Sequence, residues 1–286
     1  MPPDSTRQLR LADGRAVTVS QYGDPAGDAV LWLHGGGSSR IEGAVLHASA
    51  LDLGLRVVSP DRPGIGGSDP LPGRTVACYA TDVAEVLDLL GIEQVRVGGL
   101  SNGGMYSMAV AYGLPDRVRQ VVPVNPAIPM ADPAVRASVS RATRLSYDFV
   151  SKHPARATRG LTTPSSPGLL LRLVRQLLRD PDAATMAQPG AAAIMSAAQA
   201  EAARQADRSG LLEEVRLGPA GWDFDHRSVA APVSFLIGEK DPSLGYVRTW
   251  ATELSQGRLV VVPGGHTNVY GRPVARRACE LLRGHT

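Results

Sequence analysis

The feature that most constrains this chain of 286 residues is an alternation of short apolar runs with segments of helical periodicity. Segment 75–90 shows the helical pattern, because Val76, Val83, Val86 and Leu90 recur at helical spacing before Gly91. Such alternation is typical of βαβ units and predicts a mainly parallel sheet flanked by helices. The strand-like runs lie at 16–21, 30–33, 55–59, 94–98 and 118–124, and again at 232–238 and 258–264.

A different pattern occupies the middle of the chain. Three prolines follow the run at 118–124, and residues 126–230 contain no convincing strand. We expect three helices there, the first from Asp132-Pro133 through Phe149, the second over 170–177 and the third over 191–206. The sequence therefore predicts a sheet domain made of residues 1–125 and 231–286, with a helical lid inserted at 126–230.

Composition excludes several classes of protein. With 43% hydrophobic and 20% charged residues, the chain is typical of soluble globular proteins. Segment 1–10 has no apolar core and no run of 18 apolar residues occurs, so we expect a cytoplasmic protein without a membrane partner. The formal net charge is +3, and no basic run is interleaved with aromatic residues, which argues against nucleic-acid binding.

The cysteines and the glycine-rich loops indicate neither a metal nor a cofactor. Cys78 and Cys279 lie far apart without a partner motif, so we expect two buried, unreactive thiols. No G-x-G-x-x-G pattern or Walker lysine accompanies the glycines, which argues against a nucleotide cofactor. The expected partner is a small-molecule substrate, and homo-oligomerisation stays open.

One serine is bracketed by glycines where a strand should turn into a helix. Gly99-Leu100-Ser101-Asn102-Gly103 fits G-x-S-x-G, between the run at 94–98 and a helical pattern over 102–114. The turn is so tight that Gly99 and Gly103 must lack side chains, and it presents Ser101 at the carboxyl end of the strand. A glycine-rich turn without chemistry is the alternative, and the strand-turn-helix context disfavours it.

A serine hydroxyl needs a neighbouring base, which a third group must orient. Asp241 follows the strand-like run at 233–238, and His266 follows the run at 259–262. Because parallel strands end at one edge of a sheet, Ser101, His266 and Asp241 can converge into a catalytic triad there.

Each partner of the serine also has a structural interpretation. Asp241 could only cap the next helix, and His266 could be an ordinary loop histidine. Asp223 and Asp225 are rival carboxylates, but they precede the strand and fit the returning linker better.

The last candidate element is an oxyanion hole. His34-Gly35-Gly36-Gly37 follows the run at 30–33, a position from which a backbone N–H can point at a carbonyl under attack. We expect Gly36 to be one donor, with Gly37 as the second choice. Asn102, the residue after the serine, should supply the other N–H.

These motifs together resemble the α/β-hydrolase superfamily, in its lid-bearing branch with bacterial esterases and haloperoxidase-like enzymes. The resemblance implies an eight-stranded, mainly parallel sheet with a helical lid and a serine-centred site. Asn125 stands where some members carry the acid, and an amide cannot replace that carboxylate. Epoxide hydrolases and dehalogenases of the superfamily use an aspartate nucleophile, which Ser101 argues against. The matching segments are HGGG at 34–37, DRPGIGGSD at 61–69, GLSNGG at 99–104, WDFDH at 222–226, GEKD at 238–241 and PGGH at 263–266.

The expected activity is that of a serine hydrolase that cleaves an ester or related acyl bond of a small organic molecule through an acyl-enzyme. A lyase, C–C bond hydrolase or cyclase on the same triad, and a non-catalytic binding protein, are the alternatives. Segment 136–179 carries nine basic residues against one acid, Asp148. This excess indicates either an anionic substrate or a solvated helix face.

Overall fold

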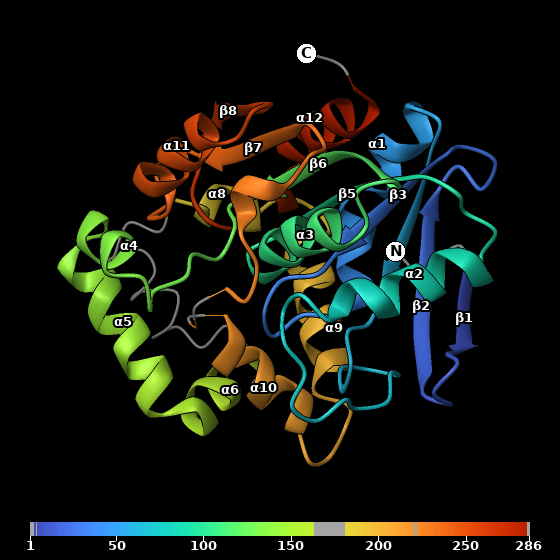
Figure 1. Cartoon of the computed structure of the whole chain (residues 1–286), viewed down its shortest axis with the longest axis horizontal. Helices are drawn as coiled ribbons and strands as arrows, with labels where there is room; N and C mark the ends of the chain where they lie inside the picture. Colours follow the sequence, from blue (N-terminus) through green and yellow to red (C-terminus); the bar gives the residue numbers. More distant parts are fainter. Residues whose placement is uncertain (1–2, 4, 163–180, 219, 221, 285–286) are drawn as a thin grey trace.

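A computed structural model describes residues 3, 5–162, 181–218, 220 and 222–284 of the chain. Its centre is an eight-stranded sheet with strand order β1-β2-β4-β3-β5-β6-β7-β8 (Figure 1). The β1-β2 and β2-β4 pairs are antiparallel and all the others are parallel, so the predicted mainly parallel sheet is confirmed. The strands are β1 (Ser5–Arg10), β2 (Ala16–Gly23), β3 (Asp28–Leu33), β4 (Leu55–Pro60), β5 (Val95–Leu100), β6 (Val118–Val124), β7 (Val233–Gly238) and β8 (Gly257–Val262).

Helices cover both faces of this sheet because successive strand residues point to opposite sides. Leu31 belongs to one buried apolar cluster and its neighbour Trp32 to a second. The first cluster includes side chains of α2 (Tyr79–Leu89), α3 (Asn102–Gly113) and α11 (Leu244–Glu253), and the second includes those of α1 (His47–Asp52) and α12 (Arg272–Arg283). Short 3₁₀ helices are η1 (Arg40–Val45), η2 (His226–Ser228) and η3 (Asn268–Tyr270).

Between β6 and β7 lies a segment, residues 126–230, that we call the inserted segment. The green helices α4, α5 and α6 lie together at one side of the molecule in Figure 1. Helix α9 lies against η1, and α10 lies against α6. The predicted helix over 170–177 falls outside the described residues. The helices of the inserted segment are α4 (Pro133–Ser138), α5 (Arg141–Lys152), α6 (Pro154–Thr162), α8 (Ala183–Met186), α9 (Ala191–Ala202) and α10 (Ser209–Leu217).

The predicted single helix from Pro133 to Phe149 is wrong, because two helices occupy this stretch. Helix α4 ends at Ser138, and Ser140 starts α5 by accepting a hydrogen bond from the Thr143 N–H at 3.1 Å. This is the N-cap arrangement that serine favours over a helix interior. The predicted apolar face is also only partly buried, since Phe149 is 49% exposed.

Two other predicted helices are shorter than expected. The helix predicted over 75–90 begins only at Tyr79, because Thr75 and Cys78 form a turn in which the Cys78 N–H donates to the Thr75 hydroxyl at 3.2 Å. The helix predicted over 191–206 ends at Ala202. Helix ends depend on local hydrogen bonds that apolar periodicity does not record.

The cysteine prediction is right for one thiol only. Cys279 is buried, and burial raises the pKa of its thiol to about 12, whereas Cys78 is half-buried. Across the described ranges, none of the helices is both long and apolar enough to cross a lipid bilayer.

Candidate active site

Ser101 alone forms the turn between β5, which ends at Leu100, and α3, which begins at Asn102. Its φ of 55° and ψ of −118° lie in a region that non-glycine residues rarely adopt. Two hydrogen bonds hold this conformation, since the Ser101 N–H donates to the Val124 carbonyl at 3.0 Å and its carbonyl accepts from the Ala127 N–H at 2.9 Å. The serine is therefore fixed against the end of β6.

The two glycines of the elbow are required by the close approach of neighbouring backbone. A Cβ on Gly99 would lie 2.5 Å from the Gly103 carbonyl carbon, and one on Gly103 would overlap the carbonyl oxygen of Leu33. As expected from the sequence, the turn is too tight for a side chain at either position.

Replacing Gly103 by alanine should lower the free energy of unfolding by about 1–3 kcal/mol, because the added methyl group overlaps backbone that cannot move aside. Gly245→Ala in α11 is the matched control, since its Cβ would meet nothing within 4 Å. The control should be neutral or slightly stabilising. Chemical denaturation measures both variants, and equal stability of the two would contradict this account of the elbow.

A cavity of about 150 Å³ brings the serine together with both expected oxyanion donors. Gly36 and Asn102 line it with Ser101, and Gly37 is not among its lining residues. The N–H of Gly35 is already bound, because both carboxylate oxygens of Glu42 accept from it at 3.1 and 3.2 Å. These contacts favour Gly36 over its glycine neighbours. The rest of the lining is Tyr147, Val150, Glu214, Val215 and Gly218.

Buried polar groups bind the backbone of the glycine loop. Glu42 is 1% exposed, and burial raises the pKa of its carboxyl, to which the Tyr270 hydroxyl donates at 3.2 Å. The carbonyl groups of the same loop are also bound, because the Arg62 guanidinium donates to those of His34 at 2.5 Å and Gly35 at 3.2 Å. Arg62 belongs to the DRPGIGGSD segment, so this motif supports the candidate oxyanion hole.

A buried ion network links this support to the inserted segment. Glu214 of α10 accepts two hydrogen bonds from Arg62, at 2.9 and 2.6 Å, and one from Arg74 at 2.5 Å. Burial alone would raise the pKa of Glu214, but the two guanidinium groups hold it well below its usual range. The amide of Asn102 also lies 3.4 Å from this carboxylate. Sequence reasoning missed Glu214, since no local pattern marks it.

Asp241 and His266 are brought into contact at the carboxyl ends of β7 and β8. The Nδ1 atom of His266 lies 2.6 Å from Oδ2 of Asp241. Desolvation favours the neutral imidazole, but the hydrogen bond to Asp241 and its negative charge raise the pKa of His266 overall. Desolvation also favours the protonated carboxyl of Asp241, but its pairing with His266 lowers the pKa of this carboxyl. The other oxygen of Asp241 accepts from the Ser243 N–H and hydroxyl. Asp241 thus caps the next turn and binds the histidine at once.

Asn125 connects the acid strand with the histidine loop. Its Oδ1 accepts from the Gly238 N–H at 2.8 Å, and its Nδ2 donates to the carbonyls of Gly265 at 3.2 Å and His266 at 2.9 Å. It follows Val124, whose carbonyl binds the serine elbow. The position that carries the acid in some resembling proteins therefore holds a structural bridge here.

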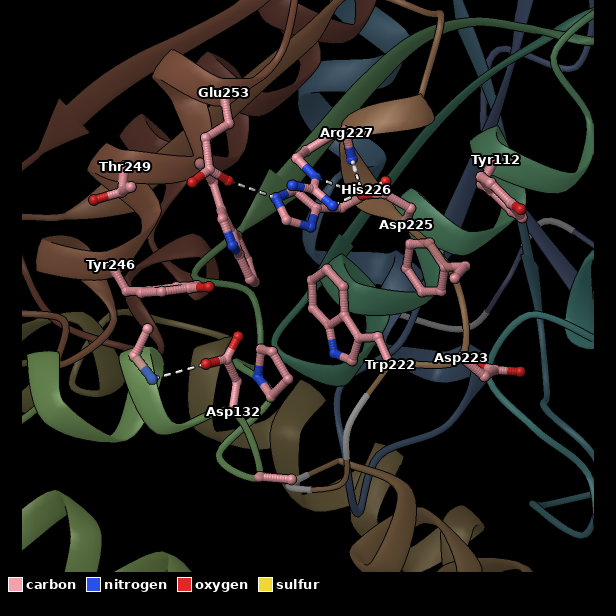
Figure 2. Close-up of a pocket in the computed structure, with 15 residues that line it drawn as sticks. Tyr112, Asp132, Trp222, Asp223, Asp225, His226, Arg227, Tyr246, Thr249 and Glu253 are labelled. Carbon is pink, nitrogen blue, oxygen red and sulfur yellow. Dashed lines mark hydrogen bonds and ion pairs between the residues drawn. The ribbon is translucent and has the colours of Figure 1, made fainter.

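The rival carboxylates lie elsewhere, in a groove of about 920 Å³ (Figure 2). Asp223 accepts from the Ala77 N–H at 3.1 Å, and Asp225 caps η2 and pairs with Arg227 at 2.8 Å. This groove has no lining residue in common with the cavity at Ser101. Both aspartates have structural partners, as expected for the linker before β7.

The basic stretch at 136–179 is only partly within the described residues. Arg136 pairs with Asp148 at 2.7 Å, while Arg172, Arg175 and Arg179 lie outside the described ranges. Among the residues that the structure describes, no group of three or more His, Cys, Asp or Glu side chains is placed to hold a metal ion.

Parts of the chain are similar in sequence to known proteins. An uncharacterized protein of Mycobacterium tuberculosis is 36% identical over 127 residues, which are 43% of this chain and 35% of the relative. A 2-hydroxy-6-oxononadienedioate/2-hydroxy-6-oxononatrienedioate hydrolase of Pseudomonas putida is 33% identical over 125 residues, or 41% of this chain and 44% of the relative. These matches span less than half of the length of either relative.

Structural similarity to a solved protein covers nearly the whole chain. The thermophilic esterase of Thermogutta terrifontis superimposes with a TM-score of 0.70 at 21% identity, over 99% of this chain and 100% of the esterase. The model of the alpha/beta hydrolase fold family matches residues 28–273, from β3 to the start of α12. By sheet order, elbow geometry and this match, the chain belongs to the alpha/beta hydrolase fold family.

Proposed function

We propose that this protein is a serine hydrolase that cleaves an ester or related acyl bond of a small organic molecule. The observation that carries the proposal is the 2.6 Å contact between His266 and Asp241, at the sheet edge where the elbow presents Ser101. A base held by a carboxylate is what a serine hydroxyl needs to become a nucleophile.

In the proposed mechanism His266 takes the proton of the Ser101 hydroxyl, and the oxygen attacks the ester carbonyl. The N–H groups of Gly36 and Asn102 then stabilise the oxyanion, and His266 returns the proton to the leaving alcohol. Water, activated by the same imidazole, attacks the acyl-enzyme and releases the acid. Asp241 keeps Nδ1 protonated and stabilises the imidazolium.

The size of the cavity favours a short acyl group. Its volume of about 150 Å³ is below the ~300–1,000 Å³ of sites that take drug-sized ligands. In this proposal residues 126–230 act as the lid, since Tyr147, Val150 and Val215 from this segment line the cavity together with Ser101. Turnover of p-nitrophenyl acetate, butyrate and decanoate should fall along the series.

The pH dependence follows from the charge of the base. His266 must be neutral to accept a proton, and the pKa of this imidazole is raised above the ordinary 6.5. We therefore expect kcat/KM to reach its maximum at higher pH and to decrease as the pH falls through a midpoint above 6.5. A pH profile of butyrate ester hydrolysis measures this, and an acid limb centred at or below pH 6.5 would contradict it.

The proposal is tested by treating the wild-type protein with a fluorophosphonate and measuring its intact mass. We expect one adduct, and none on His266→Ala, because the hydroxyl reacts only when a base removes its proton. No adduct on the folded wild-type protein would overturn the proposal. An adduct without ester turnover would point to a different substrate.

A hydrolase of a non-ester carbonyl compound is the second candidate. The observation that favours it is the relative from Pseudomonas putida, whose name assigns it a 2-hydroxy-6-oxo dienedioate substrate. Product analysis with such a compound and with simple esters distinguishes the two candidates.

A further inference from the structure

We propose that Asp182, in the inserted segment, is a positioning residue that holds the His266 loop in its working conformation. This inference rests on the proposed function, because it assigns the residue a role in orienting the base of that reaction. Asp182 precedes α8, far in sequence from both β7 and β8.

The carboxylate of Asp182 binds the backbone on both sides of His266. Its Oδ1 accepts from the Gly265 N–H at 2.7 Å, and its Oδ2 accepts from the Thr267 N–H at 2.7 Å and the Thr267 hydroxyl at 3.1 Å. Asp182 is only 3% exposed, so these bonds form away from competing water. The carboxylate therefore binds the N–H groups of the two residues on either side of the histidine.

Asn125, which follows β6, binds the carbonyl groups of the same loop. Asn125 donates to the carbonyls of Gly265 and His266, whereas Asp182 accepts from the neighbouring N–H groups. Donors and acceptors of the loop are thus bound by two different parts of the chain. Because Nδ1 of His266 is bound to Asp241 at 2.6 Å, a shift of the loop would displace the imidazole from this bonded position.

The glycine before His266 gives independent support. Gly265 has no positive φ, so its backbone would accept a side chain. A Cβ there, however, would lie 2.5 Å from Cγ of Pro181 and 2.9 Å from Oδ2 of Asp182. The second glycine of the PGGH segment is therefore explained by the approach of the inserted segment, which sequence reasoning did not anticipate.

Asp182 also contributes charge near the base. The carboxylates that face His266 are Asp241 after β7, Asp182 before α8 and Glu42 in η1, and each favours the imidazolium. An imidazolium forms when His266 takes the serine proton, so a fixed negative charge beside the loop stabilises that step. Removing the Asp182 charge should lower the pKa of His266.

The experiment compares Asp182→Asn and Gly265→Ala with the wild type, using butyrate ester hydrolysis across pH. Asparagine keeps the shape but replaces one acceptor oxygen by an amide NH2 donor that faces an N–H, so we expect kcat/KM to fall by about ten- to a hundredfold. The acid limb of its pH profile should also move to lower pH. Gly265→Ala keeps the carboxylate but displaces it, and should lower kcat/KM as well.

Asp132→Asn is the matched control, because Asp132 is an aspartate of the same segment that accepts from one backbone N–H, that of Ala134 at 2.7 Å, and only caps α4. It should retain the kcat/KM and pH profile of the wild type. The rate of fluorophosphonate labelling is a second readout, and it should fall in Asp182→Asn in the same proportion as kcat/KM.

A folded Asp182→Asn protein with wild-type kcat/KM and an unmoved acid limb would overturn the inference, even if its melting temperature were lower. Should that variant not fold, Gly265→Ala decides, and a wild-type kcat/KM in this variant would overturn the inference too. A wild-type protein that neither hydrolyses esters nor reacts with the fluorophosphonate would instead overturn the proposed function.

Discussion

Ser101→Ala should lower kcat for ester hydrolysis by about 10⁶, the loss known for other serine hydrolases when the nucleophile is removed. Alanine keeps a Cβ at φ 55°, so the strained turn and the fold should persist while the reacting oxygen is lost. Steady-state hydrolysis of a butyrate ester, with circular dichroism of the same sample, measures both expectations.

Ser107→Ala provides the matched control in the same helix. Ser107 is buried in α3 and its hydroxyl donates to the Gly104 carbonyl at 2.7 Å, so this hydrogen bond stays within the helix. This variant should keep the turnover of the wild type. More than a hundredth of the wild-type rate in purified Ser101→Ala would mean that another group is the nucleophile.

Glu214→Ala should destabilise the fold by about 3–5 kcal/mol, because it leaves the guanidinium groups of Arg62 and Arg74 buried without their shared counterion. All three side chains are buried, since that of Arg62 has no exposed surface and those of Glu214 and Arg74 are each 1% exposed. We expect the melting temperature to fall by roughly 10 °C. Thermal unfolding followed by circular dichroism measures the change.

Glu213→Ala is the control for this variant. The neighbouring Glu213 is 24% exposed and reaches Arg74 at 3.6 Å, a geometry in which an ion pair contributes little. Its loss should cost less than about 1 kcal/mol. If the two alanine variants unfold at the same temperature, the buried network does not carry the stability assigned to it.

The stabilisation from Glu214 also has a defined pH dependence. Since the pKa of its carboxyl is lowered in the folded protein, the contribution is fully present above the ordinary glutamate value and is lost as the pH falls through the lowered pKa. The difference in stability between wild type and Glu214→Ala should therefore be constant from pH 6 to 8.

The elements that could be predicted are those whose signal is local. The apolar runs of β3 and β4 and the glycine pattern around Ser101 mark buried strands and a tight turn by composition alone. Strand β1 was missed because STRQLR is polar and mostly exposed, and only its antiparallel pairing with β2 makes it a strand.

Within the candidate site, the positions after strands could be predicted because parallel strands end at one edge. That rule pointed to Asp241 and His266, and the structure places them in hydrogen-bond contact. The roles of Asp182 and Glu214 could not be predicted this way. Asp182 precedes α8 and Glu214 lies within α10 of the inserted segment, and no repeat or spacing relates them to the loops they bind.

By itself, then, the sequence determined the parallel sheet, the elbow at Ser101 and the loops in which the base and its carboxylate lie, because these depend on periodicity and on glycine at fixed offsets. Only the tertiary structure decided which buried groups hold those loops. Asn125, Asp182 and Glu214 act through hydrogen bonds and ion pairs between residues up to 152 positions apart, such as Glu214 and Arg62. Such contacts exist only once the chain has packed and water has been excluded from between them.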